Sequence, residues 1–167
     1  IRNLMRKGRH DIGFVVDPDA DRLALVCEDG TMFGEENTLV AVADYVLQHT
    51  PGNTVSNLSS SRGLRDVTEK HGCNYAPAAV GEVNVVTKMK ETGAVIGGEG
   101  NGGVIYPAAH SGRDALVGIA LILTHLAKLG CKASELRDSL PQYCISKNRI
   151  DLNPTTDIFA LLQRVKE

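Results

Sequence analysis

The segment VGEVNVVTKMKETGAVIGGEGNGGVIYP, residues 80–107, indicates the fold most clearly, because it joins a helical repeat to two short apolar runs. Residues 82–92 place Val83, Val86 and Met89 on one face of a helix. A glycine follows, and glycine is the residue that most often ends helices. The two apolar runs then flank a glycine-rich polar turn, as in strands that are joined by a tight connection. The segment therefore predicts a helix that packs on a sheet.

The rest of the chain alternates short apolar runs with longer segments of helical periodicity. We expect strands or extended segments at residues 12–16, 23–27, 55–58, 73–81 and 143–152. Helices are expected at residues 35–48, 60–71, 113–129, 133–140 and 155–166. The helix at 113–129 is apolar almost all round, so it should be deeply buried. Strands that alternate with helices indicate an α/β domain built in layers.

Length and composition limit the class of protein. The chain has 167 residues, of which 43% are apolar and 23% charged, so one compact domain is the expectation. A net charge of −2 and the absence of tryptophan argue against a nucleic-acid partner. The four cysteines form no CxxC pair and are interpreted as reduced thiols of a cytoplasmic protein. The longest apolar run, residues 115–127, is shorter than the roughly 20 residues of a membrane span, so no membrane partner is expected.

The sequence DPDADR, residues 17–22, places three carboxylates and one guanidinium beside a predicted buried strand. Such charges are costly to desolvate unless they are paired or bind a metal. If the loop bends, Asp17, Asp19 and Asp21 can point at one cation, and oxygen ligands suit Mg²⁺, Mn²⁺ or Ca²⁺. Arg22 would add a planar pair of donors for a phosphate group.

Other interpretations of this loop stay open. An EF-hand would use Glu28 as its twelfth residue, but it requires a glycine where Arg22 stands, and Pro18 and the β-rich flanks also disagree. A phosphatase with an aspartate nucleophile fits the position after a strand. A solvated acidic turn is the simplest alternative, although it does not account for the adjacent arginine.

The sequence GGEGNGG, residues 97–103, carries one carboxylate and one amide among five glycines. It contains no GK[ST], and a strand rather than a helix follows it, so neither a P-loop nor a dinucleotide fingerprint fits. On an exposed turn, Glu99 and Asn101 would suit the vicinal hydroxyls of a sugar. A plain glycine-rich hairpin is the alternative. Glu82, at a helix start, can be a partner of the helix dipole, and His110 is interpreted as a surface-loop residue.

The order and spacing of these two loops resemble the phosphohexomutase family, which comprises phosphoglucomutases, phosphomannomutases and phosphoglucosamine mutases. Its members have four domains around one cleft, and residues 80–107 look like part of the third. The resemblance implies a three-layer α/β domain with a mixed sheet flanked by helices. It assigns residues 1–32 to the end of the second domain, 33–143 to the third and 144–167 to the start of the fourth. The chain is then expected to be a fragment of a longer protein.

The resemblance also implies roles for the polar residues. Asp17, Asp19 and Asp21 would be ligands of Mg²⁺, and Arg22 would act at the transferred phosphate. Glu99 and Asn101 would bind hydroxyls of the hexose phosphate substrate.

Three positions depart from the pattern of the family. Many relatives have serine at the position of Asn101, histidine at Gly103 and a basic residue at Glu82.

The expected parent enzyme interconverts hexose 1-phosphate and hexose 6-phosphate through a phosphoserine and Mg²⁺. No Thr/Ser-Ala-Ser-His-Asn-Pro stretch and no phosphate-binding loop of the fourth domain occur in this sequence. The serines at residues 59–61 are better placed to cap a helix. We therefore expect the chain to be inactive alone and to need the remaining domains of its parent as partners. A non-catalytic module that binds metal or sugar phosphate is the alternative.

Overall fold

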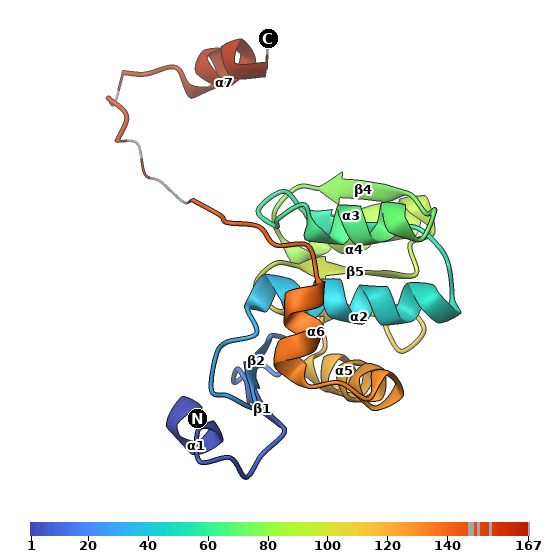
Figure 1. Ribbon diagram of the computed structural model, residues 1–167. Helices are drawn as coiled ribbons and strands as arrows, with labels where there is room; N and C mark the ends of the chain where they lie inside the picture. The colour runs from blue at the N-terminus through green and yellow to red at the C-terminus, as the bar shows by residue number, and fades with distance from the viewer. Residues whose placement is uncertain (147–148, 150, 154, 167) are drawn as a thin grey trace.

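The computed structural model describes residues 1–146, 149, 151–153 and 155–166 (Figure 1). The described elements are, in chain order, α1 (Arg2–Met5), β1 (Ile12–Val16), β2 (Leu23–Cys27), α2 (Glu35–His49), β3 (Thr54–Asn57), α3 (Gly63–Lys70), β4 (Tyr75–Ala78), α4 (Glu82–Thr92), β5 (Ile96–Glu99), β6 (Gly103–Ile105), α5 (Ala115–Leu129), α6 (Ala133–Ser139) and α7 (Ile158–Lys166). The alternation of strands and helices that the sequence predicts is confirmed.

Four strands form the central sheet, in the order β4-β3-β5-β6. β3 runs parallel to β4 and β5, and β6 returns antiparallel to β5, so the sheet is mixed, as expected. β1 and β2 form a separate antiparallel hairpin. The carboxyl ends of β3, β4 and β5 therefore meet at one edge of the sheet, which is where open α/β sheets usually bind ligands.

α4 covers one face of the sheet. Val85 and Met89 of α4 are buried there with Val55 and Ile105. The helix is where the periodicity predicted it, but the predicted contact face is partly wrong, because Val83 is 78% exposed.

α2 and α3 cover the opposite face, and α5 packs on α2 in an outer layer (Figure 1). Leu23 and Leu25 of β2 belong to the same core as α2, α3 and α5. The expected deep burial of α5 is wrong, because this outer position leaves one side of the helix uncovered: Leu116 is 65% exposed. Buried α5 residues are limited to Ala115, Gly118, Ile122 and His125.

Several predicted helix ends are confirmed by their geometry. Gly93 and Gly130 follow α4 and α5 in the left-handed conformation, with φ of 62° and 64°. The start of α3 differs from expectation, because Arg62 occupies the N-cap position. The Ser61 hydroxyl instead accepts the backbone N–H of Gly63 at 3.2 Å.

The C-terminal α7 lies apart from the rest of the chain in Figure 1. It starts at Ile158, later than the predicted residue 155. The extended segment predicted at 143–152 lies partly outside the described residues.

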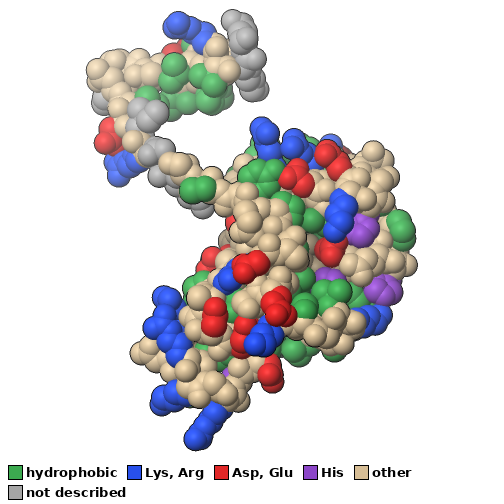
Figure 2. All heavy atoms as spheres, in the orientation of Figure 1, with side chains coloured by type: hydrophobic (Ala, Val, Ile, Leu, Met, Phe, Trp, Pro, Cys, Tyr) green, Lys and Arg blue, Asp and Glu red, His purple; other side chains and the backbone are tan. Residues whose placement is uncertain are grey.

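Basic side chains gather around the N-terminal segment that contains α1 (Figure 2). In the described part of the chain no single helix is long and apolar enough to cross a membrane. α5 and α6 reach such a length only together, and they are bent by 91° relative to each other.

Candidate functional site

Glu99 is the last residue of β5 and lies at the carboxyl edge of the sheet. Its Oε1 accepts hydrogen bonds from Nδ2 of Asn57 at 2.7 Å and from the backbone N–H of Gly81 at 3.3 Å. Its Oε2 accepts a hydrogen bond from Nη1 of Arg113. The expectation that Glu99 lies on an exposed turn is wrong: the residue is 3% exposed, because the turn begins only after it.

Asn101 lies on the turn itself and is exposed, as expected. Its Oδ1 accepts the backbone N–H of Gly103 at 3.1 Å. Gly102 has a φ of 91°, and its carbonyl accepts the N–H of Leu23 at 3.0 Å. A Cβ at residue 102 would collide with the Leu23 carbonyl, so glycine is required there. These contacts fasten the sugar loop, residues 97–103, to β2.

Asp17 organises the metal loop, residues 17–22, which connects β1 to β2. Its Oδ1 accepts the backbone N–H groups of Asp21 and Arg22, both at 3.2 Å, and its Oδ2 lies 2.6 Å from Nε of Arg22. Desolvation opposes ionisation of Asp17, but the hydrogen bonds from Arg22 and Asp21 outweigh it and hold the pKa at about 2. Asp17 is therefore an anion at neutral pH.

Asp19 and Asp21, the other two aspartates of the metal loop, differ from Asp17 in their contacts. Asp19 is exposed, whereas Asp21 Oδ2 accepts a hydrogen bond from Nη2 of Arg113. Desolvation is the main cause that raises the pKa of Asp21. Among the described residues no group of three or more His, Cys, Asp or Glu side chains is arranged to hold a metal ion, so the aspartates do not converge in this structure.

The residues of the metal loop nevertheless fit a hard cation. They supply only oxygen donors, as Mg²⁺ prefers. Oδ1 of Asp21 is buried without a hydrogen-bond partner and lies 3.6 Å from Nε of Arg22, so a cation would take the place of this guanidinium contact. The assignment of Asp17, Asp19 and Asp21 as ligands, and of Arg22 to the phosphate, stays a prediction.

Arg113 is the residue that joins the two loops, and local sequence patterns did not identify it as functional. It contacts Asp21 of the metal loop and Glu99 of the sugar loop. Glu82 contacts it twice: Oε1 accepts the Arg113 backbone N–H at 2.8 Å, and Oε2 lies 3.6 Å from Nε. Glu82 also lies in the first turn of α4, in agreement with the helix-dipole interpretation.

His110 lies next to this cluster in the loop before α5. It is half exposed, and its Nε2 lies 2.8 Å from Oδ2 of Asp114. Asp114 caps α5, because its Oδ1 accepts the backbone N–H groups of Leu116 and Val117. The interpretation of His110 as a surface-loop residue agrees with this position.

Comparison with protein families gives a match over residues 35–143, to the model described as phosphoglucomutase/phosphomannomutase, alpha/beta/alpha domain III. A phosphoglucomutase/phosphomannomutase of Thermococcus kodakarensis is 38% identical over 134 residues, which are 80% of this chain and 29% of that protein. A phosphoglucosamine mutase of Sulfurovum sp. is 32% identical over 167 residues, 95% of this chain and 37% of that protein.

Solved structures of this family have a similar fold. A phosphoglucomutase/phosphomannomutase family protein of Burkholderia thailandensis superposes with a TM-score of 0.76 at 29% identity, over 85% of this chain and 31% of that one. An N-acetylglucosamine-phosphate mutase superposes with a TM-score of 0.62 at 14% identity, over 78% of this chain and 38% of that one, which shows the fold alone. The chain thus spans about a third of the length of these proteins.

Proposed function

Because the chain belongs to the phosphoglucomutase/phosphomannomutase family, we propose that it supplies the metal loop and the sugar loop of a hexose phosphate mutase. The full-length protein would interconvert hexose 1-phosphate and hexose 6-phosphate. The observation that carries the proposal is the junction of the two loops: Asp21 and Glu99 contact the same guanidinium, that of Arg113. The proposed cation site and the proposed hydroxyl site would thereby be adjacent, as phosphoryl transfer to a sugar requires.

The metal loop would act on the phosphoryl group. Bound Mg²⁺ would neutralise charge on the transferring oxygens. Asp17, Asp19 and Asp21 would hold it through carboxylate oxygens. Arg22 is half exposed and bonded to Asp17 by Nε, so its remaining N–H donors are free to bind phosphate oxygens.

The sugar loop would position the hydroxyl that accepts the phosphoryl group. Glu99 already accepts hydrogen bonds from Asn57, Gly81 and Arg113, and a carboxylate has about four lone-pair positions, so one position would be left for a sugar hydroxyl. Asn101 is exposed on the turn beside it. A sugar held at these two side chains must present two different hydroxyls in turn, since the phosphoryl group would move between O1 and O6. Closure by the other domains would exclude water, which would otherwise hydrolyse the phosphoenzyme.

Relatives carry the names phosphoglucomutase/phosphomannomutase and phosphoglucosamine mutase, so glucose, mannose and glucosamine phosphates are all candidates. The test is an isomerisation assay of the full-length protein with each hexose 1-phosphate, Mg²⁺ and a 1,6-bisphosphate activator. We expect turnover by the full-length protein and none by the 167-residue chain, which contains no phosphoserine motif. Failure of the full-length protein with all three sugars would overturn the proposal.

Two other functions give different results in this assay. A binding module would retain a hexose phosphate without turnover by the full-length protein. A phosphatase would release inorganic phosphate, and the release would depend on Asp17. Turnover by the chain alone that disappears on substitution of Ser59, Ser60 or Ser61 would place the nucleophile in this chain instead.

A further inference from the structure

We propose that Arg113 is a positioning residue that holds Asp21 and Glu99 as one unit, so that cation binding at one loop depends on the same side chain as sugar recognition at the other. The inference rests on the proposed function for the identity of the two ligands. The contacts that carry it are properties of the chain itself.

The charge and burial of Arg113 explain how it can hold the metal loop and the sugar loop together. Its side chain is 17% exposed, and it lies among the carboxylates of Asp21, Glu82 and Glu99. Nη1 donates to Glu99 and Nη2 donates to Asp21, so the two arms of one planar group fix the separation of the two loops. A lysine carries a point charge on a flexible stem and could not hold two acceptors in this way.

The backbone of Arg113 is also fixed. Its N–H donates to Glu82 at 2.8 Å, and residue 113 forms a β-bridge with Ile105. The next residue, Asp114, donates its N–H to the carbonyl of Val104 at 2.9 Å. The side chain therefore starts from a defined point beside β6 and reaches both loops.

Gly103 provides the space that Arg113 occupies. A Cβ at residue 103 would lie 2.5 Å from Cδ of Arg113, 3.2 Å from Oδ1 of Asn101 and 3.3 Å from Cγ of Arg113. Cδ and Cγ belong to the middle of the arginine side chain. A larger residue at position 103 would therefore shift the outer half of Arg113, including its guanidinium. The glycine and the arginine are therefore parts of one arrangement.

The contact with Asp21 leaves one oxygen for a cation. Arg113 binds Oδ2, whereas Oδ1 is buried without a hydrogen-bond partner and has Nε of Arg22 as a charged neighbour at 3.6 Å. A partner that orients a metal-binding carboxylate in this way typically changes metal affinity by about 10- to 100-fold when it is removed. The same substitution would also free Glu99 from one of its three partners.

The test uses the full-length protein with Mn²⁺ as the probe, and affinity is measured by calorimetry. Arg113→Gln should weaken Mn²⁺ binding by about 10- to 100-fold and raise KM for the hexose phosphate. Arg113→Lys should not restore wild-type values, because the two-armed contact is lost. Gly103→Ala, which keeps every charge, should change both quantities in the same direction. Arg65→Gln, which removes an ion-paired guanidinium on α3 outside the site, should change neither.

The inference is overturned if Mn²⁺ affinity and KM of Arg113→Gln and Gly103→Ala stay within twofold of wild type, or if the wild-type protein does not bind Mn²⁺. Should Arg113→Gln fail to fold, the Mn²⁺ affinity of Gly103→Ala decides, because its KM can also change through the neighbouring Asn101. The two proposals can be tested separately. Absence of isomerisation by the wild-type protein would reject the proposed mutase function, whereas the Mn²⁺ affinities of the variants would still test the positioning role of Arg113.

Discussion

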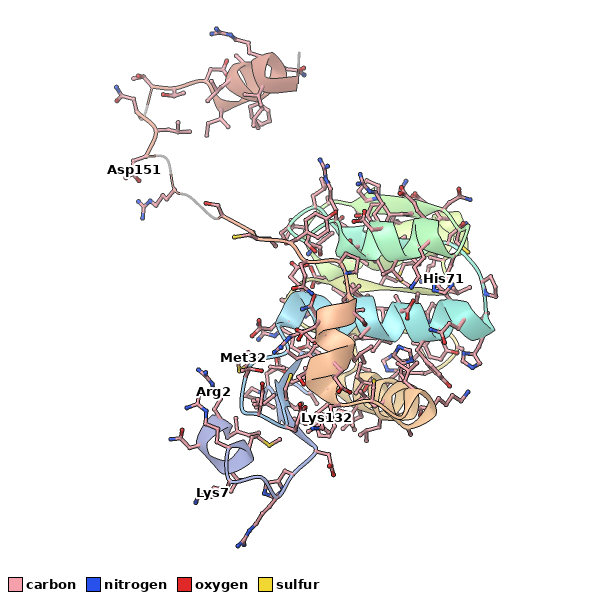
Figure 3. All side chains as sticks on the ribbon, in the orientation of Figure 1. Arg2, Lys7, Met32, His71, Lys132 and Asp151 are labelled. Atoms are coloured by element: carbon pink, nitrogen blue, oxygen red, sulfur yellow. The ribbon has the colours of Figure 1, made fainter. Side chains whose placement is uncertain are left out.

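Oδ1 of Asp44 in α2 lies 2.8 Å from Nε2 of His71. His71, which is labelled in Figure 3, directly follows α3. Nε2 of the buried His125 in α5 lies 3.5 Å from the other oxygen of Asp44. One carboxylate therefore connects three helices on the same side of the sheet. This cluster lies outside the candidate functional site, so its expected contribution is to stability.

We predict that the Asp44 cluster makes stability depend on pH in the acid range. Burial raises the pKa of Asp44, but the nearby imidazole of His125, the hydrogen bond with His71 and the charge of Lys70 outweigh it and lower the pKa from 3.8 to about 2. A lowered pKa means that the stabilisation is complete above about pH 4 and is lost as the pH falls through 2. Its size is about 2 kcal/mol, at about 1.4 kcal/mol per pKa unit.

Urea unfolding of Asp44→Asn and wild type at pH 6 and at pH 2.5 measures this effect. The difference in unfolding free energy should be about 2 kcal/mol at pH 6 and clearly smaller at pH 2.5. Asp138→Asn is the control, since its carboxylate is 66% exposed and its ion pair with Arg137 should contribute under about 1 kcal/mol. A difference for Asp44→Asn that does not change with pH would contradict the prediction.

The second prediction concerns Glu99. In the full-length protein, Glu99→Gln should lower kcat/KM by about 10- to 100-fold, because a hydrogen bond to a charged group contributes about 1.5–3 kcal/mol. Since Glu99 is buried, the substitution should also lower the free energy of unfolding, by about 1–3 kcal/mol.

Kinetics and urea unfolding measure the two effects, with Glu91→Gln as the matched control. Glu91 is exposed on α4 and pairs with Lys88, so its substitution should change neither quantity. Unchanged kinetics in Glu99→Gln would mean that this carboxylate does not recognise the sugar.

The third prediction concerns the metal loop. Asp19 is exposed, so Asp19→Asn should lower Mn²⁺ affinity of the full-length protein at least about 10-fold and leave its stability within about 0.5 kcal/mol. Asp17→Asn should lower both, because Asp17 also receives three hydrogen bonds within the loop. Equal Mn²⁺ affinity in Asp19→Asn and wild type would remove Asp19 from the ligand set.

Local sequence patterns predicted the elements apart from the short α1 and some helix starts, but they did not predict the partners of the site residues. Apolar periodicity and terminal glycines predict α4 and the strand after it, because both depend on neighbouring residues. The contact between Asn57 and Glu99 joins residues 42 positions apart, and that between Asp21 and Arg113 joins residues 92 apart. Such pairs depend on which strand ends meet, and no local repeat encodes that.

Burial was the least predictable property, for a related reason. Apolar composition cannot show what covers a helix, so α5 was expected to be buried on all sides although it packs only on one. Glu99 was expected to be exposed because it lies among glycines, but β5 extends through Glu99, three residues into the predicted turn of residues 97–103. Fold class and the two loops were thus predictable, whereas their connection through Arg113 was not.

The last prediction tests the contact face of α4 through two valines of that helix. Val85 is fully buried against the sheet, whereas Val83 is 78% exposed. Val85→Ala removes two buried carbon atoms and leaves a cavity, so it should lower the free energy of unfolding by about 1.5–3 kcal/mol. Val83→Ala should change it by less than about 0.5 kcal/mol, and a small gain is reasonable because alanine favours helices. Urea unfolding of the two variants under one condition makes the comparison direct, since residue type and helix are the same. A larger loss in Val83→Ala than in Val85→Ala would show that the helix packs through the face that the sequence periodicity predicted.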